Sequence, residues 1–338
     1  MLKHCLLMSL LAAASLNARA DLVVLQYHHV DDSTPPSTST SVSLFRAQMD
    51  MVETMGLPVV PLKEGTVKAL EGDDRKEVAI TFDDAYDSVY ETAAPLLEDH
   101  GFPYTVFVNT DAVGRTGYMT WEQLRTLSGR PGVTIANHSA DHGHLVQRPD
   151  ENAEDWNRRV DQSLDRASEA LQNRLESDPT LFAYPYGEFD VQLQKKLRGR
   201  QWYGYGQQSG PIGPGSDSTR MPRFPMANAY GQLGSLKSKL KSLAFPTEAN
   251  ALPDSVIRSN PPALDLTLSD AWSPKRLTCF ASGMGRIEIS IEGQNRVNVE
   301  APRPFDSRRF RYNCTYPAGN GHFFWLSQPW LDLSRPED

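Results

Sequence analysis

Short apolar runs alternate along the chain with longer segments whose apolar residues recur at helical spacing. The runs at 22–27, 78–82, 104–108, 133–136, 181–184 and 202–205 are rich in apolar, β-branched and aromatic residues, and we predict a strand at each. Helices are predicted over 43–56, 88–100, 150–176 and 191–197. Thr120 and Gln123 have the spacing of a capping box, which predicts a further helix start. This alternation is typical of parallel β/α units, and six or seven of them favour a barrel over an open sheet.

The pattern changes after a proline-containing segment at 246–262. Residues 263–338 carry short runs with partial period-two alternation and turn residues between them. We predict strands at 264–268, 276–281, 286–291, 297–300, 310–316 and 322–326. The predicted organisation is therefore an α/β domain over 21–245, a linker over 246–262 and a small β-sandwich domain over 263–338.

The first twenty residues have the pattern of an export signal. A short polar start is followed by an apolar stretch at 6–16, and Ala18-Arg19-Ala20 resembles a small-residue cleavage site. The alternative is a short buried helix. We expect a signal peptide over 1–20 and a periplasmic or secreted mature protein.

The cysteines fit an exported chain. If residues 1–20 are removed, Cys279 and Cys314 remain, and in an oxidising compartment they are expected to form one disulfide. The alternative is two reduced core thiols. A cysteine metal site is disfavoured because two cysteines without a CxxC motif offer too few ligands.

The charge and the motifs that are missing exclude several functional classes. With 34 basic and 42 acidic residues the net charge is −8, without the basic clusters that nucleic-acid binding needs. Beyond the N-terminus the sequence has no apolar run of about 20 residues, so no internal membrane span is predicted. It also lacks GxSxG, GxGxxG and GxxxxGK[ST], which disfavours serine hydrolases and enzymes that bind dinucleotides or nucleoside triphosphates.

Three polar segments lie at the ends of predicted strands: TFDD at 81–84, HSADH at 138–142 and YPYG at 184–187. In parallel β/α folds the carboxyl ends of the strands form the active site, so the three segments should converge. His138 and His142 are spaced to hold one metal ion, and a carboxylate can supply a third ligand and leave a position open for water. Of two adjacent carboxylates, one can bind the metal while the other acts as a base. Each motif alone is usually coincidental; the combination predicts a catalytic metal site.

The region from about residue 22 to 243 resembles the NodB-like polysaccharide deacetylases, which form carbohydrate esterase family four. The resemblance rests on the three segments above. It is closest to the exported subgroup that deacetylates poly-β-1,6-N-acetylglucosamine, through YHHV at 27–30 and MPRFP at 221–225. The family fold, a distorted (β/α)7 barrel, agrees with the alternation. The β-rich tail lies outside the resemblance.

The resemblance implies a role for each matching residue. Asp83 is expected to be the general base, and Asp84, His138 and His142 the ligands of a divalent metal, with Zn²⁺ the first choice and Co²⁺ or Ni²⁺ as alternatives. The backbone N–H of Tyr186 is expected to help bind the oxyanion.

Two positions depart from the family pattern. Ala183 stands where the family's third motif has an arginine that holds the base, so Asp83 needs another partner. Arg223 is the candidate; the alternative is an ordinary surface or barrel-rim arginine. The family's late catalytic histidine is also missing, and the exported subgroup implies His28 in its place. Since strand side chains alternate, His29 should point to the opposite face.

The implied activity is hydrolysis of N-acetyl groups on an N-acetylhexosamine polysaccharide. The same site could serve a peptidoglycan or chitooligosaccharide deacetylase or a glycan O-acetyl esterase. From another class, the departures would suit a glycan-binding protein with impaired catalysis. An acetylated polysaccharide is the expected substrate, and exopolysaccharide export machinery is a candidate partner.

Overall fold

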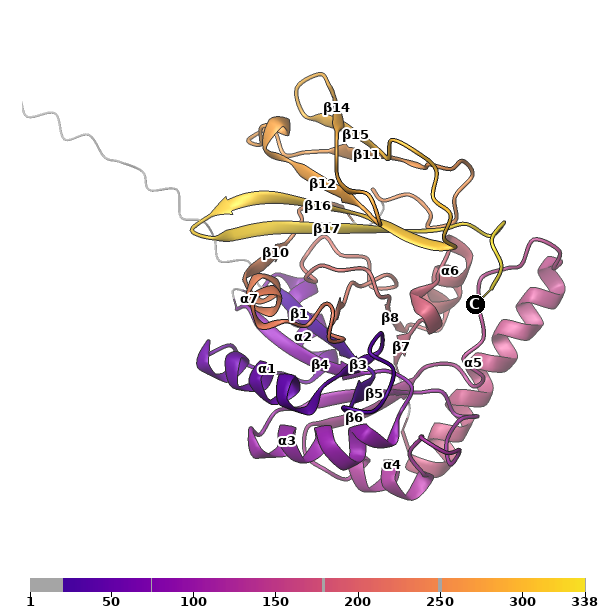
Figure 1. The fold of residues 1–338 in the computed structure, drawn as a ribbon. Helices are drawn as coiled ribbons and strands as arrows, with labels where there is room; N and C mark the ends of the chain where they lie inside the picture. Colours follow the sequence, from indigo (N-terminus) through magenta and orange to yellow (C-terminus); the bar gives the residue numbers. More distant parts are fainter. Residues whose placement is uncertain (1–20, 74, 178–179, 249–250, 338) are drawn as a thin grey trace, which may run out of the picture.

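The structure is a computed structural model, and it describes residues 21–73, 75–177, 180–248 and 251–337. The predicted signal peptide over 1–20 lies outside these ranges. Figure 1 shows the N-terminal part as an α/β body with the C-terminal strands, in orange to yellow, stacked above it. Within the described ranges no helix combines the length and the apolar character needed to cross a bilayer.

A seven-stranded parallel sheet forms the α/β body. Its order is β8 (Tyr203–Tyr205), β7 (Leu181–Ala183), β6 (Val133–Asn137), β5 (Tyr104–Val108), β4 (Glu77–Phe82), β1 (Leu22–Tyr27) and β9 (Phe224–Pro225). Strands β1, β4 and β5 are buried at every residue, which explains why they read as continuous apolar runs. The sheet curves into a half-barrel, so the predicted distorted barrel class is confirmed.

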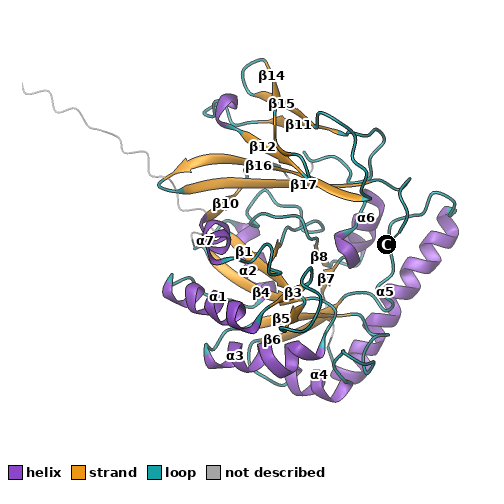
Figure 2. Cartoon of the chain, in the orientation of Figure 1, coloured by secondary structure: helices purple, strands orange, loops and turns teal. Residues whose placement is uncertain are grey.

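Helices cover the outer face of this sheet, as Figure 2 shows. They are α1 (Val42–Thr54), α2 (Leu62–Glu71), the π-helix η1 (Val89–Ala93), α3 (Ala94–Asp99), α4 (Trp121–Ser128), α5 (Ala153–Leu175), α6 (Val191–Gly199) and α7 (Leu233–Lys241). The predicted helix over 88–100 is divided, because Pro95 cannot donate a helical hydrogen bond and stands in the first turn of α3 after the π-helix. The capping box at Thr120 is formed. Helices α2 and α7 were not predicted.

Two sheets make up the C-terminal part. One has the order β10 (Ser242–Ala244), β17 (His322–Leu331), β16 (Arg309–Gly319), β12 (Thr278–Ala281) and β13 (Gly285–Ile287); the other has β11 (Ala263–Thr267), β15 (Arg296–Glu300) and β14 (Ile289–Glu292). Side chains of both sheets share one apolar core, as expected of a sandwich. The predicted strand at 286–291 is in fact two strands, β13 and β14, in different sheets.

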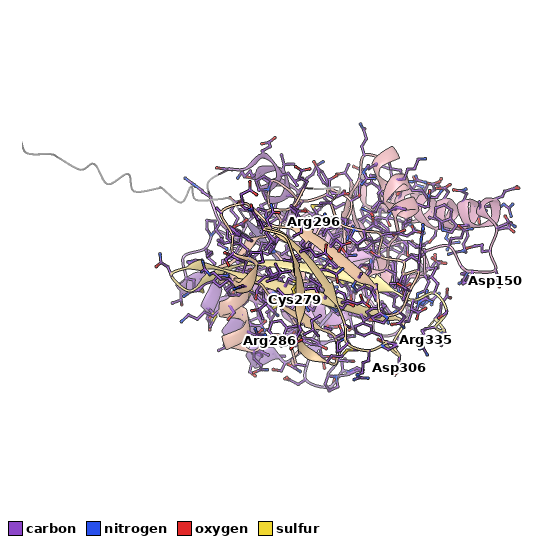
Figure 3. All side chains as sticks on the ribbon, turned by 90° about the horizontal axis from the view of Figure 1, so that it is seen from above. Asp150, Cys279, Arg286, Arg296, Asp306 and Arg335 are labelled. Carbon is purple, nitrogen blue, oxygen red and sulfur yellow. A yellow bond between two sulfur atoms is a disulfide. The ribbon has the colours of Figure 1, made fainter. Side chains whose placement is uncertain are left out.

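Four smaller elements belong to the fold: the paired strands β2 (His29–Val30) and β3 (Ser39–Thr40), and two 3₁₀ turns, η2 (Pro185–Gly187) and η3 (Pro274–Arg276). Cys279 on β12 lies directly opposite Cys314 on β16, and the two form a disulfide, as predicted (Figure 3).

Strand β10 lies inside the range 21–245 but pairs with β17. It thereby ties the end of the α/β body to the sandwich. The division of the chain at 245 and 263 stays a prediction.

Strand β16 connects the sandwich to the α/β body. Its even-numbered residues from 310 to 316 are buried in the sandwich core, whereas its odd-numbered residues are only partly buried. Among the latter, Arg311 donates to the carbonyl of Gln207 in the α/β body at 2.9 Å. Arg220 of the α/β body donates to Gln328 of β17 at 2.8 Å. The sandwich is therefore fixed above the carboxyl edge of the half-barrel.

Candidate active site and metal centre

A cleft of about 920 Å³ opens at the carboxyl ends of the parallel strands. The α/β body lines one side with residues that include His28, Asp84, His142 and Tyr186. The structure thus brings the predicted site segments together, as parallel strand topology requires.

The ligand atoms of Asp84, His138 and His142 all lie within 4.8 Å of one another. Asp84 Oδ1 is 3.2 Å from His142 Nε2 and 3.5 Å from His138 Nε2. Nδ1 of His138 is 2.7 Å from the carbonyl of Ala183, which orients the ring with Nε2 toward Asp84. A metal-binding histidine is commonly held in this way through its other nitrogen.

The electrostatics of the three residues suit a cation. Burial raises the pKa of Asp84 to about 6 and lowers that of His138 to about 3. Oδ1 of Asp84 is buried without a hydrogen-bond partner among the described residues. A divalent ion would stabilise this carboxylate and use the lone pairs of the neutral imidazoles, so the residues fit a metal centre with two histidines and one carboxylate.

Three site residues have left-handed backbone conformations: Asp84 with φ 73°, His142 with φ 53° and Tyr186 with φ 58°. Such conformations are unfavourable for residues other than glycine and are found at functional sites, where the surroundings enforce them. Each of the three stands in the loop that follows a parallel strand, β4, β6 or β7, and each lines the cleft.

Asp83 is fully buried and is held by Arg223. Nη1 and Nη2 of Arg223 donate to the two carboxylate oxygens of Asp83 at 2.7 and 2.8 Å. Burial alone would raise the pKa of Asp83, but the charge and hydrogen bonds of Arg223, together with the nearby histidines, outweigh burial and hold the pKa well below its usual range. Arg223 is itself fully buried, so it is not a surface arginine. It pairs with Asp83 in place of the arginine that the family pattern has at position 183, where this chain has alanine.

The two adjacent histidines lie in different surroundings. His28 lines the cleft. His29 stacks on the ring of Tyr86 at 3.6 Å between centroids. The structure therefore gives His28 access to the reaction site, while its catalytic role stays a prediction.

Tyr186 lies on the turn η2 beside the metal-site histidines. Its ring contacts His142 at 4.6 Å between centroids and stacks on His144 at 4.1 Å, nearly parallel. Nδ1 of His144 is 2.8 Å from the buried carboxylate of Glu188, two residues after Tyr186. The turn is thereby packed against the segment that follows the HSADH motif.

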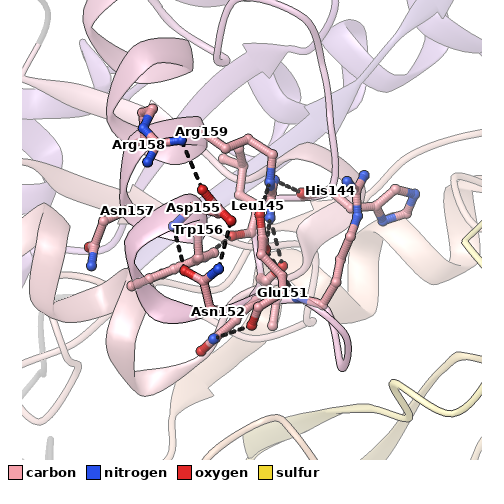
Figure 4. Close-up of polar contacts among 12 residues, drawn as sticks. His144, Leu145, Glu151, Asn152, Asp155, Trp156, Asn157, Arg158 and Arg159 are labelled. Atoms are coloured by element: carbon pink, nitrogen blue, oxygen red, sulfur yellow. Dashed lines mark hydrogen bonds and ion pairs between the residues drawn. The ribbon is translucent and has the colours of Figure 1, made fainter.

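Helix α5 holds that segment from its other side (Figure 4). Arg159 donates to the carbonyls of His144 and Val146 at 2.6 and 3.3 Å. The same guanidinium pairs with Glu151, and the indole N–H of Trp156 donates to the carbonyl of Leu145 at 2.8 Å. These bonds satisfy the carbonyls of the loop and fix the chain just beyond His142.

Several residues around the site were not identified from the sequence. Gln26 donates to Asp83 at 2.6 Å; the only signal for it is one polar residue in an apolar strand. Lys239 of α7 lines the cleft, and so do Arg309 and Arg311 of β16. Nothing in the local sequence around these cationic residues connects them to the motifs.

The fold and the site together are those of an α/β half-barrel with a candidate Asp-His-His metal centre at the carboxyl edge of its strands. Residues 71–201 match the family model described as polysaccharide deacetylase. Residues 71–201 are thus similar to the polysaccharide deacetylases, and the family resemblance noted in the sequence is confirmed for this domain.

Similar proteins agree with this assignment. The chain is 26% identical to YxkH of Bacillus subtilis, over 52% of this chain and 60% of that protein. It is 24% identical to the poly-β-1,6-N-acetyl-D-glucosamine N-deacetylase of Escherichia coli K12, over 52% of this chain and 32% of that enzyme. The match thus spans less than two thirds of either relative.

Among solved structures, IcaB from Ammonifex degensii superposes with a TM-score of 0.58 and 25% identity, over 65% of this chain and 97% of that chain. A deacetylase from Bordetella bronchiseptica, the BpsB deacetylase domain, superposes with a TM-score of 0.51 at 21% identity. The second likeness supports the fold.

Proposed function

We propose that the protein is a metal-dependent hydrolase that removes N-acetyl groups from poly-β-1,6-N-acetylglucosamine or a similar exopolysaccharide. The observation that carries the proposal is the cluster of Asp84, His138 and His142, two of which line the cleft, next to Asp83, which is held by a buried arginine. The named activity of the Escherichia coli relative supports the choice of substrate.

The metal would be held by Asp84, His138 and His142, with Zn²⁺ the first choice. When bound, a divalent cation supplies Lewis-acid chemistry to the acetyl carbonyl and the attacking water.

Asp83 takes one proton from that water, and Arg223 and Gln26 keep its carboxylate in place. The water oxygen adds to the acetyl carbon, and the developing oxyanion receives a hydrogen bond from the backbone N–H of Tyr186. His28 donates a proton to the amide nitrogen as the carbon–nitrogen bond breaks. Acetate and the free amine of the sugar are the products.

The proposal includes export of the protein to the periplasm or the exterior, where it would meet the polysaccharide and its export machinery. The predicted signal peptide and the disulfide between Cys279 and Cys314 support this location.

Acetate release tests the proposal. The purified protein is assayed on an acetylated β-1,6-linked glucosamine pentamer, on a chitopentaose and on an O-acetylated xylan, before and after treatment with a chelator. We expect release from the β-1,6 pentamer, its loss with chelator and its recovery with Zn²⁺. Undiminished release after chelation, with the metal content verified as zero, would disprove the metal dependence; release from another substrate alone would change the substrate assignment.

A further inference from the structure

The C-terminal sandwich supplies one wall of the cleft, which we call the β16–β17 wall: Arg309, Arg311, Asn313 and Trp325. On β16 the three residues are two apart, so they lie on one face of the strand. That face points toward the α/β body, since the alternate residues fill the sandwich core. A polysaccharide chain in the cleft would therefore lie between the metal centre and this wall.

Arg311 differs from the arginines beside it. Arg308 and Arg309 both donate to the carboxylate of Glu188, at 2.9 and 3.0 Å. Among the residues that the structure describes, the side chain of Arg311 makes one hydrogen bond, to the backbone carbonyl of Gln207. Burial lowers the pKa of Arg311, and within the described ranges no carboxylate pairs with its guanidinium. Arg311 lines the cleft, so donors of its guanidinium that are not used by Gln207 can reach a ligand there.

Asn313 supplies the complementary group. Its Oδ1 is buried without a hydrogen-bond partner among the described residues. The same is true of the indole Nε1 of Trp325. Trp325 lies opposite Thr315 and is a diagonal neighbour of Asn313 across the β16–β17 pair, about 7–8 Å away by sheet geometry. Unsatisfied buried polar atoms are rare in folded proteins, and here they lie together in a cleft.

We propose that Arg311 and Asn313 form a subsite that recognises the acetamido group of a second N-acetylhexosamine in the bound polysaccharide. An acetamido group has one carbonyl oxygen and one N–H. The guanidinium of Arg311 donates to the carbonyl oxygen, and Oδ1 of Asn313 accepts from the N–H. A free amine, protonated at neutral pH, would instead be repelled by Arg311. This subsite rests on the proposed function for the identity of the glycan.

The subsite gives the enzyme a preference for substrates with an acetylated neighbour. As deacetylation proceeds, fewer sugars have such a neighbour, so the rate should fall before the polymer is fully deacetylated. The expected product is a partially deacetylated chain.

The test compares two β-1,6-linked glucosamine pentamers, one acetylated on every sugar and one on a single sugar. For the wild-type holoenzyme we expect kcat/KM per acetyl group to be about tenfold higher on the fully acetylated pentamer, the effect of a hydrogen bond to a charged donor. Arg311→Met keeps the length of the side chain and should reduce this ratio toward one. Asn313→Ala should also reduce it, and Arg311→Lys should keep part of it.

Arg296→Gln is the matched control, because Arg296 is an exposed arginine on β15 of the same sandwich (Figure 3). The ratio in this variant should equal the wild-type ratio. Thermal unfolding of each variant shows whether the fold is retained, and the ratio is independent of the fraction of active enzyme.

Calorimetric binding of the fully acetylated pentamer, with chelator present to prevent turnover, separates the two proposals. Binding that is weakened by Arg311→Met, without acetate release by wild-type holoenzyme, would support the subsite and disprove the proposed activity. Acetate release with the same ratio in wild type, Arg311→Met and Asn313→Ala would disprove the subsite and leave the activity standing. If the wild-type protein neither binds the pentamer nor releases acetate, the subsite and the proposed activity are both wrong.

Discussion

Replacing Glu188 by glutamine should both destabilise the protein and disturb the turn that carries Tyr186. The carboxylate of Glu188 is 3% exposed and lies between the two parts of the chain. It contacts His144 at 2.8 Å in the α/β body and accepts from Arg308 and Arg309 of the sandwich at 2.9 and 3.0 Å. The amide of Glu188→Gln keeps the size of the side chain but removes the charge that these donors require.

The magnitude follows from the pKa of Glu188. Burial alone would raise this pKa, but the hydrogen bonds and the charges of His144 and Arg308 together outweigh burial and lower it from 4.5 to about 2. That lowering corresponds to roughly 3 kcal/mol of stability at neutral pH. The loss of one partner from a buried ion pair costs a similar ~3–5 kcal/mol. We therefore expect Glu188→Gln to lower the free energy of unfolding by about 3 kcal/mol at pH 7.

The pH dependence gives an independent check on the same number. Since the pKa in the folded state is below the unfolded value, the contribution is complete above about pH 4.5 and is lost as the pH falls toward 2. The difference in unfolding free energy between wild type and Glu188→Gln should therefore shrink by roughly 2 kcal/mol between pH 7 and pH 3. Urea unfolding at several pH values measures it.

A matched control separates the buried carboxylate from carboxylates in general. Glu292 pairs with Arg296 at 3.9 Å, and both side chains are more than half exposed, so Glu292→Gln should change stability by less than about 1 kcal/mol. Equal effects of the two variants, or a Glu188→Gln difference that does not change with pH, would refute the reasoning.

Three further predictions concern the proposed roles. Asp83→Asn should keep the metal and lower kcat about 10²–10⁴-fold, whereas Asp84→Asn should lower the metal content itself. Metal content and kcat are measured on both variants, and equal metal loss in the two would contradict the assignment of base and ligand. His28→Ala should lower kcat about 10²–10⁴-fold and His29→Ala much less, and the reverse order would give the acid role to His29. Cys279→Ser opens a disulfide between residues 35 apart and should destabilise the sandwich by roughly 3–4 kcal/mol in urea unfolding; an unchanged midpoint would show that the bridge adds no stability.

The parts of the fold that are buried on both faces could be predicted from the sequence. Strands β1, β4 and β5 read as apolar runs because helices cover one side and the barrel core the other. Strands β9 and β10 were not predicted, since two or three residues carry no detectable period. The segment 286–291 alternates throughout, and its division between two sheets depends on packing that no local pattern encodes.

The motif residues of the candidate site could be named from the sequence because each lies next to a predicted strand end. Glu188 and Arg311 could not be identified, since their importance comes from contacts across more than 100 positions of sequence. A buried charge acquires its role from the partner that the fold brings to it. For such residues the sequence shows only an ordinary charged side chain.

The partner of Asp83, Arg223, follows only from the sequence and the fold taken together. The sequence shows that position 183 holds alanine, which leaves a carboxylate of the TFDD motif without its expected partner. Only the fold shows that the chain of β9 passes the same carboxylate on the opposite side from β7, close enough for a bidentate pair. An isolated buried carboxylate would be neutral or would destabilise the fold, so a chain that lacks the arginine on β7 needs a cation from another strand. The backbone carbonyl of Ala183, which any residue at this position would supply, lies 2.7 Å from Nδ1 of His138. The charge that fixes Asp83 therefore comes from a different strand, while the geometry at the metal centre is held by backbone.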